Sequence, residues 1–129
     1  MPGFVTSHRD LDVYQAAYST GQRVFELTKS WPSEEKFALT TQIRNSSRSV
    51  CGNIAEAWRK RRYRKSLISK LNDAEAEAAE TQVWLDHAAS CGYISKELAS
   101  ELSAAYEKIM GMLFGMIQHA DKWCIDPDK

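Results

Sequence analysis

The sequence has few of the residues that interrupt helices or build cross-linked folds. Its 129 residues include 3 prolines, 6 glycines and 3 cysteines. Only Pro32 lies away from the ends of the chain, so most of its length is open to long helices. Cys51, Cys91 and Cys124 are widely spaced and form no C-x-x-C pair, which argues against a disulfide framework and a zinc motif. We expect reduced thiols.

Long apolar runs are also missing. The longest strongly apolar stretch, Ile109–Ile117, has nine residues. A helix that crosses a bilayer needs roughly 20. The amino terminus, MPGFVTSHRDLD, has no apolar core of the length found in signal peptides. We therefore expect a cytoplasmic protein with no membrane partner.

Catalytic and cofactor motifs are absent as well. The sequence contains no G-x-S-x-G, phosphate-binding loop or dinucleotide fingerprint. A di-iron bundle requires Glu-x-x-His motifs, and none occurs. His8, His87 and His119 lie in different segments without ligand spacing. We expect no enzymatic activity, no cofactor and no metal site.

The whole chain has no excess of either charge, because 17 Lys+Arg balance 17 Asp+Glu, but its segments do. Residues 40–70 hold nine basic side chains and one acidic side chain, whereas residues 71–129 hold four basic and eleven acidic ones. The neutral total therefore conceals a strong charge dipole along the chain.

Apolar periodicity predicts four helices within one domain that covers residues 1–129. The expected segments are His8–Ser30, Glu34–Arg61, Arg64–Ser90 and a last one from Ser95 to about Trp123. The expected caps are Ser7 with Asp10, Ser33 and Ser95 at helix starts, and Gly92 at a helix end. No alternating β-branched run competes. Helices of this length joined by short loops predict an all-α fold, an antiparallel up-down four-helix bundle.

Two seams with four-three spacing define the expected core. The second segment carries Ile43, Ser47, Val50, Ile54 and Ala57. The third carries Leu67, Leu71, Ala74, Ala78, Thr81, Leu85 and Ala88. The first and fourth segments each carry two apolar stripes, although one stripe is enough for a lone bundle. The extra stripes indicate either a second buried interface or a wide core stripe with some exposed apolar residues.

Three stretches also resemble a known family. Residues His8–Ala17 read HRDLDVYQAA, residues Trp31–Ala57 read WPSEEKFALTTQIRNSSRSVCGNIAEA, and residues Cys91–Ser95 read CGYIS. These resemble the S23 family of four-helix-bundle proteins, encoded in intervening sequences of bacterial 23S ribosomal RNA genes. The resemblance covers nearly the whole chain. Ala57 departs from the family pattern, in which a glycine usually follows NIAE.

The resemblance has implications for assembly and partners. It implies a homopentameric ring, in which the second apolar stripes would be buried. The architecture is also similar to that of the accessory protein of diversity-generating retroelements, a pentameric barrel that binds nucleic acid and a reverse transcriptase. The biochemical role of the S23 proteins themselves is poorly defined.

The densest positive charge is the run RKRRYRK at Arg59–Lys65. Such clusters bind phosphates through counterion release, and aromatic side chains such as Tyr63 and Trp58 can stack on bases. The candidate residues for binding RNA or DNA are Arg44, Arg48, Arg59, Lys60, Arg61, Arg62, Tyr63, Arg64 and Lys65.

A structural alternative to nucleic-acid binding stays open. Positive charge at a helix C-terminus opposes the helix dipole favourably. The run could also pair with acidic residues of the third segment, which are Asp73, Glu75, Glu77 and Glu80. The protein would then be an oligomeric scaffold or adaptor that binds a protein partner, with its charges used for subunit pairing.

Gln42, Asn53 and Glu56 place polar groups on a segment that is otherwise mostly apolar. Buried amides and carboxylates need hydrogen-bond partners. We expect a structural polar network that fixes helix register or subunit orientation, with Arg48 or a basic residue of a neighbouring subunit as the partner of Glu56. The alternative is a ligand or catalytic pocket.

Overall fold

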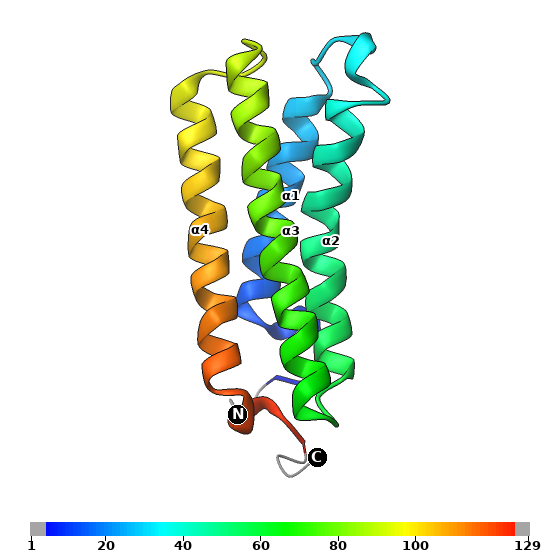
Figure 1. Cartoon of the computed structure of the whole chain (residues 1–129), viewed down its shortest axis with the longest axis vertical. Helices are drawn as coiled ribbons and strands as arrows, with labels where there is room; N and C mark the ends of the chain where they lie inside the picture. The colour runs from blue at the N-terminus through cyan, green and yellow to red at the C-terminus, as the bar shows by residue number, and fades with distance from the viewer. Residues whose placement is uncertain (1–4, 126–129) are drawn as a thin grey trace.

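Four long helices run alternately up and down in the computed structural model, which describes residues 5–125 (Figure 1). They are α1 (Asp12–Thr28), α2 (Leu39–Arg59), α3 (Arg64–Ser90) and α4 (Lys96–Gln118). The short elements are the 3-10 helices η1 (His8–Asp10) and η2 (Ser33–Glu35), and α5 (Ala120–Trp123). No strand occurs within residues 5–125. The predicted four-helix bundle is confirmed.

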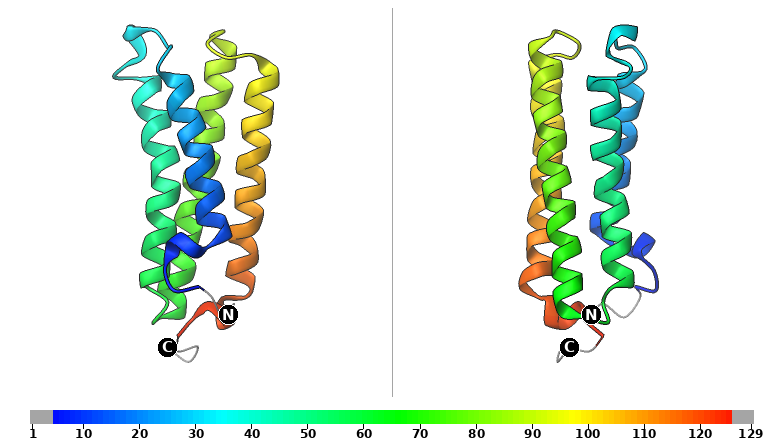
Figure 2. Two further views of the ribbon diagram at one scale, coloured as in Figure 1. Left: turned by 180° about the vertical axis from the view of Figure 1, so that it is seen from behind. Right: turned by 45° about the vertical axis from the view of Figure 1, so that its right-hand side comes forward.

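Each long helix packs against its neighbours in the chain, and α1 also packs against α4. Seen from behind, α1 lies between α2 and α4 (Figure 2). The α1–α2 and α3–α4 connections lie at one end of the bundle. The α2–α3 turn lies at the other end, together with α5 (Figure 1).

The core is built on the two predicted seams. Every predicted seam residue of α2 and of α3 is buried. Between these helices, the Thr81 hydroxyl donates to the Ser46 hydroxyl over 2.8 Å, in a region closed to solvent. The α1 helix approaches α2 closely at Gly21, where an added Cβ would lie 3.8 Å from the Ser47 carbonyl oxygen. The seams therefore hold three helices together.

One of the two predicted apolar stripes of α1, the one with Tyr14 and Tyr18, lies partly outside the core. Val13, Ala17 and Val24 face the interior, whereas the Tyr18 side chain is 53% exposed and Tyr14 is half-buried. On α4 the buried residues are Ala99, Leu102, Tyr106, Ile109, Leu113 and Met116. Tyr18 on α1 and Phe114 on α4, which is 52% exposed, therefore leave apolar surface outside the core, and this fits both sequence interpretations.

The start of α2 differs from the prediction, because Glu34 does not begin the helix and Ser33 does not cap it. Residues Ser33–Glu35 form η2 instead, and α2 begins at Leu39. One carboxylate oxygen of Glu35 accepts the Leu39 N–H over 3.3 Å, and the other accepts the Tyr93 hydroxyl over 2.8 Å. Glu35 thus caps α2 and ties the α1–α2 loop to the α3–α4 loop.

The other predicted helix ends are largely confirmed. Ser7 accepts the Arg9 N–H, and Asp10 accepts the Ser7 N–H, but this capping box begins η1 and not the long helix. Ser95 caps α4 by accepting the Leu98 N–H. Gly92 has a φ of 79°, in the left-handed region that suits glycine. The last helix ends at Gln118, and α5 follows as a separate turn.

Tyr106 is completely buried, and its hydroxyl has no hydrogen-bond partner among the described residues. Burial raises the pKa of this phenol, so the hydroxyl stays protonated. A buried hydroxyl without a partner costs stability. We expect Tyr106→Phe to raise the free energy of unfolding by about 1 kcal/mol, measured by urea denaturation.

The matched control is Tyr93→Phe, which removes a hydroxyl that is hydrogen-bonded to Glu35. This variant should lower the free energy of unfolding. A loss of stability in Tyr106→Phe instead would mean that its hydroxyl is hydrogen-bonded in solution.

Candidate nucleic-acid interface

The basic run occupies the end of the bundle that also carries α5 (Figure 1). Arg59 is the last residue of α2, and Arg64 is the first residue of α3. Between them the chain leaves the helix at Lys60 (φ −95°, ψ 13°) and becomes extended at Tyr63 (φ −125°, ψ 121°). The turn therefore gathers the basic side chains at one end of the molecule.

Four basic side chains of the run are exposed: Arg59, Lys60, Arg62 and Lys65. None of the four forms an ion pair with another residue in the range 5–125. Tyr63, in the same turn, is 49% exposed. The acidic residues of α3 thus leave this part of the run unneutralised within the described chain.

Two arginines of the run hold the turn instead, Arg61 through Trp58 of α2 and Arg64 through α5. The Arg61 guanidinium lies 3.5 Å from the centroid of the Trp58 ring, and its Nε donates to the Trp58 carbonyl oxygen over 2.7 Å. Burial, together with Arg59, lowers the pKa of Arg61. The Arg64 Nε pairs with the Asp121 carboxylate over 2.8 Å.

Trp58 is only 4% exposed and packs edge-on against Trp123. The suggestion that it stacks on bases is therefore wrong, and Tyr63 remains the aromatic side chain of the run that is open to bases.

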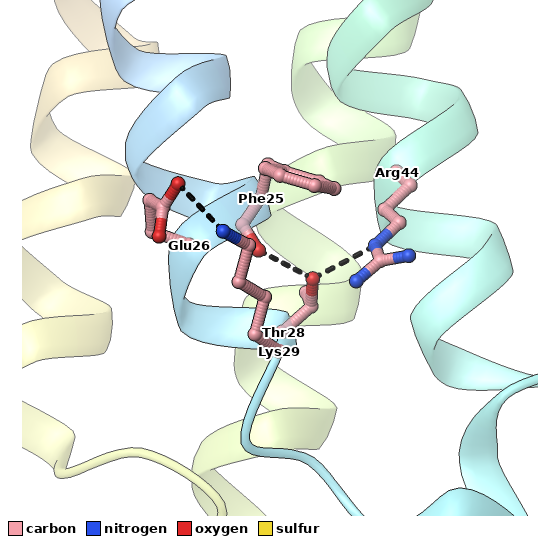
Figure 3. A network of polar contacts seen from close by, with 5 residues as sticks. All are labelled: Phe25, Glu26, Thr28, Lys29 and Arg44. Atoms are coloured by element: carbon pink, nitrogen blue, oxygen red, sulfur yellow. Dashed lines mark hydrogen bonds and ion pairs between the residues drawn. The ribbon is translucent and has the colours of Figure 1, made fainter.

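Arg44 and Arg48 belong to a separate cluster near the other end of α2. The Arg44 Nε donates to the Thr28 hydroxyl over 2.8 Å (Figure 3). The Arg44 and Arg48 guanidinium carbons lie 4.7 and 5.4 Å from the centroid of the Phe25 ring, and the Lys29 ammonium lies 5.0 Å from it. These contacts are cation–π interactions.

Helical rise separates the two clusters. From Arg44 to Arg59 the α2 axis advances by about 22 Å, at 1.5 Å per residue. Arg44 and Arg59 therefore lie at different levels of α2, and Arg44 and Arg48 have their own contacts with α1.

The predicted polar network does not form within the described chain. Gln42 is exposed. The Asn53 amide donates to the Ser49 carbonyl oxygen of its own helix over 2.9 Å. Glu56 is exposed and pairs with Lys70, not with Arg48, over 2.9 Å. All three positions lie off the buried seam of α2, so they share no buried network among residues 5–125, and a network between subunits stays a prediction.

Lys70 belongs to a feature that sequence reasoning missed, a shallow pocket of about 320 Å³ beside the basic run. The pocket is lined by His8, Ala55, Glu56, Arg59, Lys60 and Lys70. Its hydrogen bond to Lys70 lowers the pKa of the Glu56 carboxyl, and the same bond raises the pKa of Lys70. The high density of basic residues from 40 to 70 included Lys70, but no local signal placed η1 beside α2.

Among residues 5–125, no group of three or more His, Cys, Asp and Glu side chains could hold a metal ion. None of the described helices is both long enough and apolar enough to cross a bilayer.

Comparison with known proteins places the chain in a family. A family model described as "23S rRNA-intervening sequence protein" matches residues 9–115. A crystal structure of a protein of unknown function from Bacteroides thetaiotaomicron, assigned to the S23 ribosomal protein family, is 31% identical, with a TM-score of 0.74. The alignment covers 82% of this chain and 95% of that one. No curated protein matches in sequence. The chain therefore belongs to the 23S rRNA-intervening sequence protein family.

Proposed function

We propose that this protein is a non-catalytic binder of nucleic acid. It contacts the phosphate backbone of RNA or DNA through the exposed basic side chains of the Arg59–Lys65 run, which we call the basic end. The observation that carries the proposal is that Arg59, Lys60, Arg62 and Lys65 are exposed and form no salt bridge among the described residues. Like charges held together in one turn attract polyanions, and binding is driven by the release of counterions.

Contacts of two other arginines of the run fix the turn that presents these charges. Arg61 is stacked on buried Trp58, and Arg64 is paired with Asp121 of α5. The other basic side chains can therefore meet a phosphate backbone without first ordering the turn. Tyr63 adds an exposed ring for stacking on unpaired bases, which favours single strands at this end.

A closed oligomer, a ring of five subunits, is the second part of the proposal. The exposed Phe114 on α4 supports it, because this ring is 52% exposed. Gly111 and Gly115 lie on the same helix, and an added Cβ at either would meet nothing within 4 Å. Without side chains at these two positions, α4 offers a surface that a helix of a second subunit can approach closely. A ring would repeat the basic end and strengthen weak binding through multivalency.

The basic end can be tested with Arg62→Gln combined with Lys65→Gln, because both side chains are exposed and neither lines the pocket. Fluorescence anisotropy with labelled single-stranded RNA and duplex DNA would be measured as a function of salt. If each side chain meets one phosphate, the slope of log affinity against log salt for the single strand should fall by about 1.4.

Lys96→Gln combined with Lys108→Gln is the matched control, since it removes the same charge from exposed positions on α4. It should leave the slope nearly unchanged. If the slope falls equally in the two variants, the effect comes from the net charge of the protein and not from this surface. Absence of any binding near physiological salt would overturn the proposal in favour of the scaffold or adaptor that binds a protein.

The oligomer can be tested by light scattering. The wild-type mass should be a small multiple of 14.6 kDa, and Phe114→Arg should shift it to that of one chain, because a buried charge without a partner opposes assembly. Gln42→Arg, at an exposed position of α2, is the control and should keep the wild-type mass. A wild-type monomer would contradict the ring.

A further inference from the structure

The pocket beside the basic run combines side chains from three elements. His8 comes from η1, Glu56 and Arg59 come from α2, Lys60 follows at its end, and Lys70 comes from α3. Ala55 provides the one small apolar wall. Because residues this far apart in the chain converge there, the pocket is a product of the fold.

The polar groups of the pocket leave an excess of positive charge. Arg59, Lys60 and Lys70 contribute three cations, and Glu56 contributes one carboxylate. Burial and the nearby Arg9 lower the pKa of His8 below 6.5, so His8 is mostly neutral at pH 7. The lining residues thus carry two positive charges in excess, part of which Asp73 beside Lys70 offsets from outside the pocket.

Glu56 and a bound anion would compete for the same ammonium group. The Lys70 Nζ lies 2.9 Å from the nearer Glu56 oxygen and 3.7 Å from an Asp73 oxygen. An ammonium group has three donors. An anion in the pocket would therefore share Lys70 with Glu56, and the carboxylate would weaken the binding of that anion.

We propose that this pocket binds one phosphate group of a nucleic-acid strand, held by Arg59, Lys60 and Lys70. The inference rests on the proposed function and deepens it, because it adds a defined contact to a diffuse basic surface. The phosphate comes either from inside the strand or from its end. A terminal phosphate carries about −1.5 to −2 at pH 7 and has three acceptor oxygens, so it matches the charge of the pocket more closely than an internal phosphodiester.

The test uses two substitutions that break the same ion pair but change the charge of the pocket in opposite directions. Lys70→Gln removes a cation, and Glu56→Gln removes the competing carboxylate. At 100 mM salt, the loss of one phosphate contact on a single strand corresponds to about a fivefold loss of affinity. We expect Lys70→Gln to weaken binding of a labelled RNA oligonucleotide by about that factor, and Glu56→Gln to strengthen it.

A purely structural ion pair predicts a different result, because both substitutions would then change binding in the same direction or not at all. Either outcome would overturn the proposal that the pocket binds a phosphate group. The variant Arg62→Gln with Lys65→Gln separates the two proposals, since it lies outside the pocket. If it weakens binding while Lys70→Gln and Glu56→Gln have no effect, the basic end binds nucleic acid and the pocket does not. If the wild type does not bind, both proposals fail.

The source of the phosphate follows from a second pair of probes, the same oligonucleotide with a 5′ phosphate or a 5′ hydroxyl. A Lys70→Gln loss seen only with the phosphorylated probe would place the terminal phosphate in the pocket. An equal loss with both probes would place an internal phosphate there. Circular dichroism of each variant checks that the helices are intact.

Discussion

The contact between α2 and α3 is the constraint on which the rest of the molecule depends. Each helix buries an uninterrupted apolar seam, and the Thr81 hydroxyl donates to the Ser46 hydroxyl between the two seams inside the core. Both hydroxyls also reach a carbonyl oxygen of their own helix, that of Glu77 for Thr81 and that of Ile43 for Ser46, so the hydrogen bond adds one link to a contact that the apolar seams set. The seam of α2 ends at Ala57 and that of α3 starts at Leu67, which obliges the chain to turn between them. The basic run is exposed because the core ends there.

The parts of the fold that could be predicted are those set by neighbours along the chain. The α3 helix begins and ends at the predicted residues, because its seam is continuous and Gly92 follows it. The beginning of α2 could not be predicted, since its cap is the Glu35 carboxylate, positioned partly by Tyr93 from the opposite loop. A serine before an acidic pair is a local signal for a helix start, and this distant contact overrides it.

The candidate site shows the same division. The density of positive charge in the sequence identified the Arg59–Lys65 run as the candidate interface, but it gave no reason to distinguish one arginine of the run from another. Arg61 and Arg64 differ from their neighbours because Trp58 and Asp121 are within reach, and only the folded chain brings Asp121 there. Likewise, Arg44 bonds to Thr28 of a different helix. His8 could not be assigned to the site at all, because its place beside α2 depends on how η1 folds back over the bundle.

The tie between Glu35 and Tyr93 has a consequence for how the two ends of the bundle respond to ionic strength. At the end with the α1–α2 and α3–α4 loops, the neutral Tyr93 phenol donates a hydrogen bond to the Glu35 carboxylate. This hydrogen bond raises the Tyr93 pKa to about 12, so Tyr93 keeps its proton throughout the neutral range. At the other end, Arg64 and Asp121 form an exposed ion pair, which dissolved salt screens. The polar ties at the two ends therefore differ in kind: salt weakens the Arg64–Asp121 pair, whereas the hydrogen bond between Tyr93 and Glu35 does not depend on a pair of opposite charges.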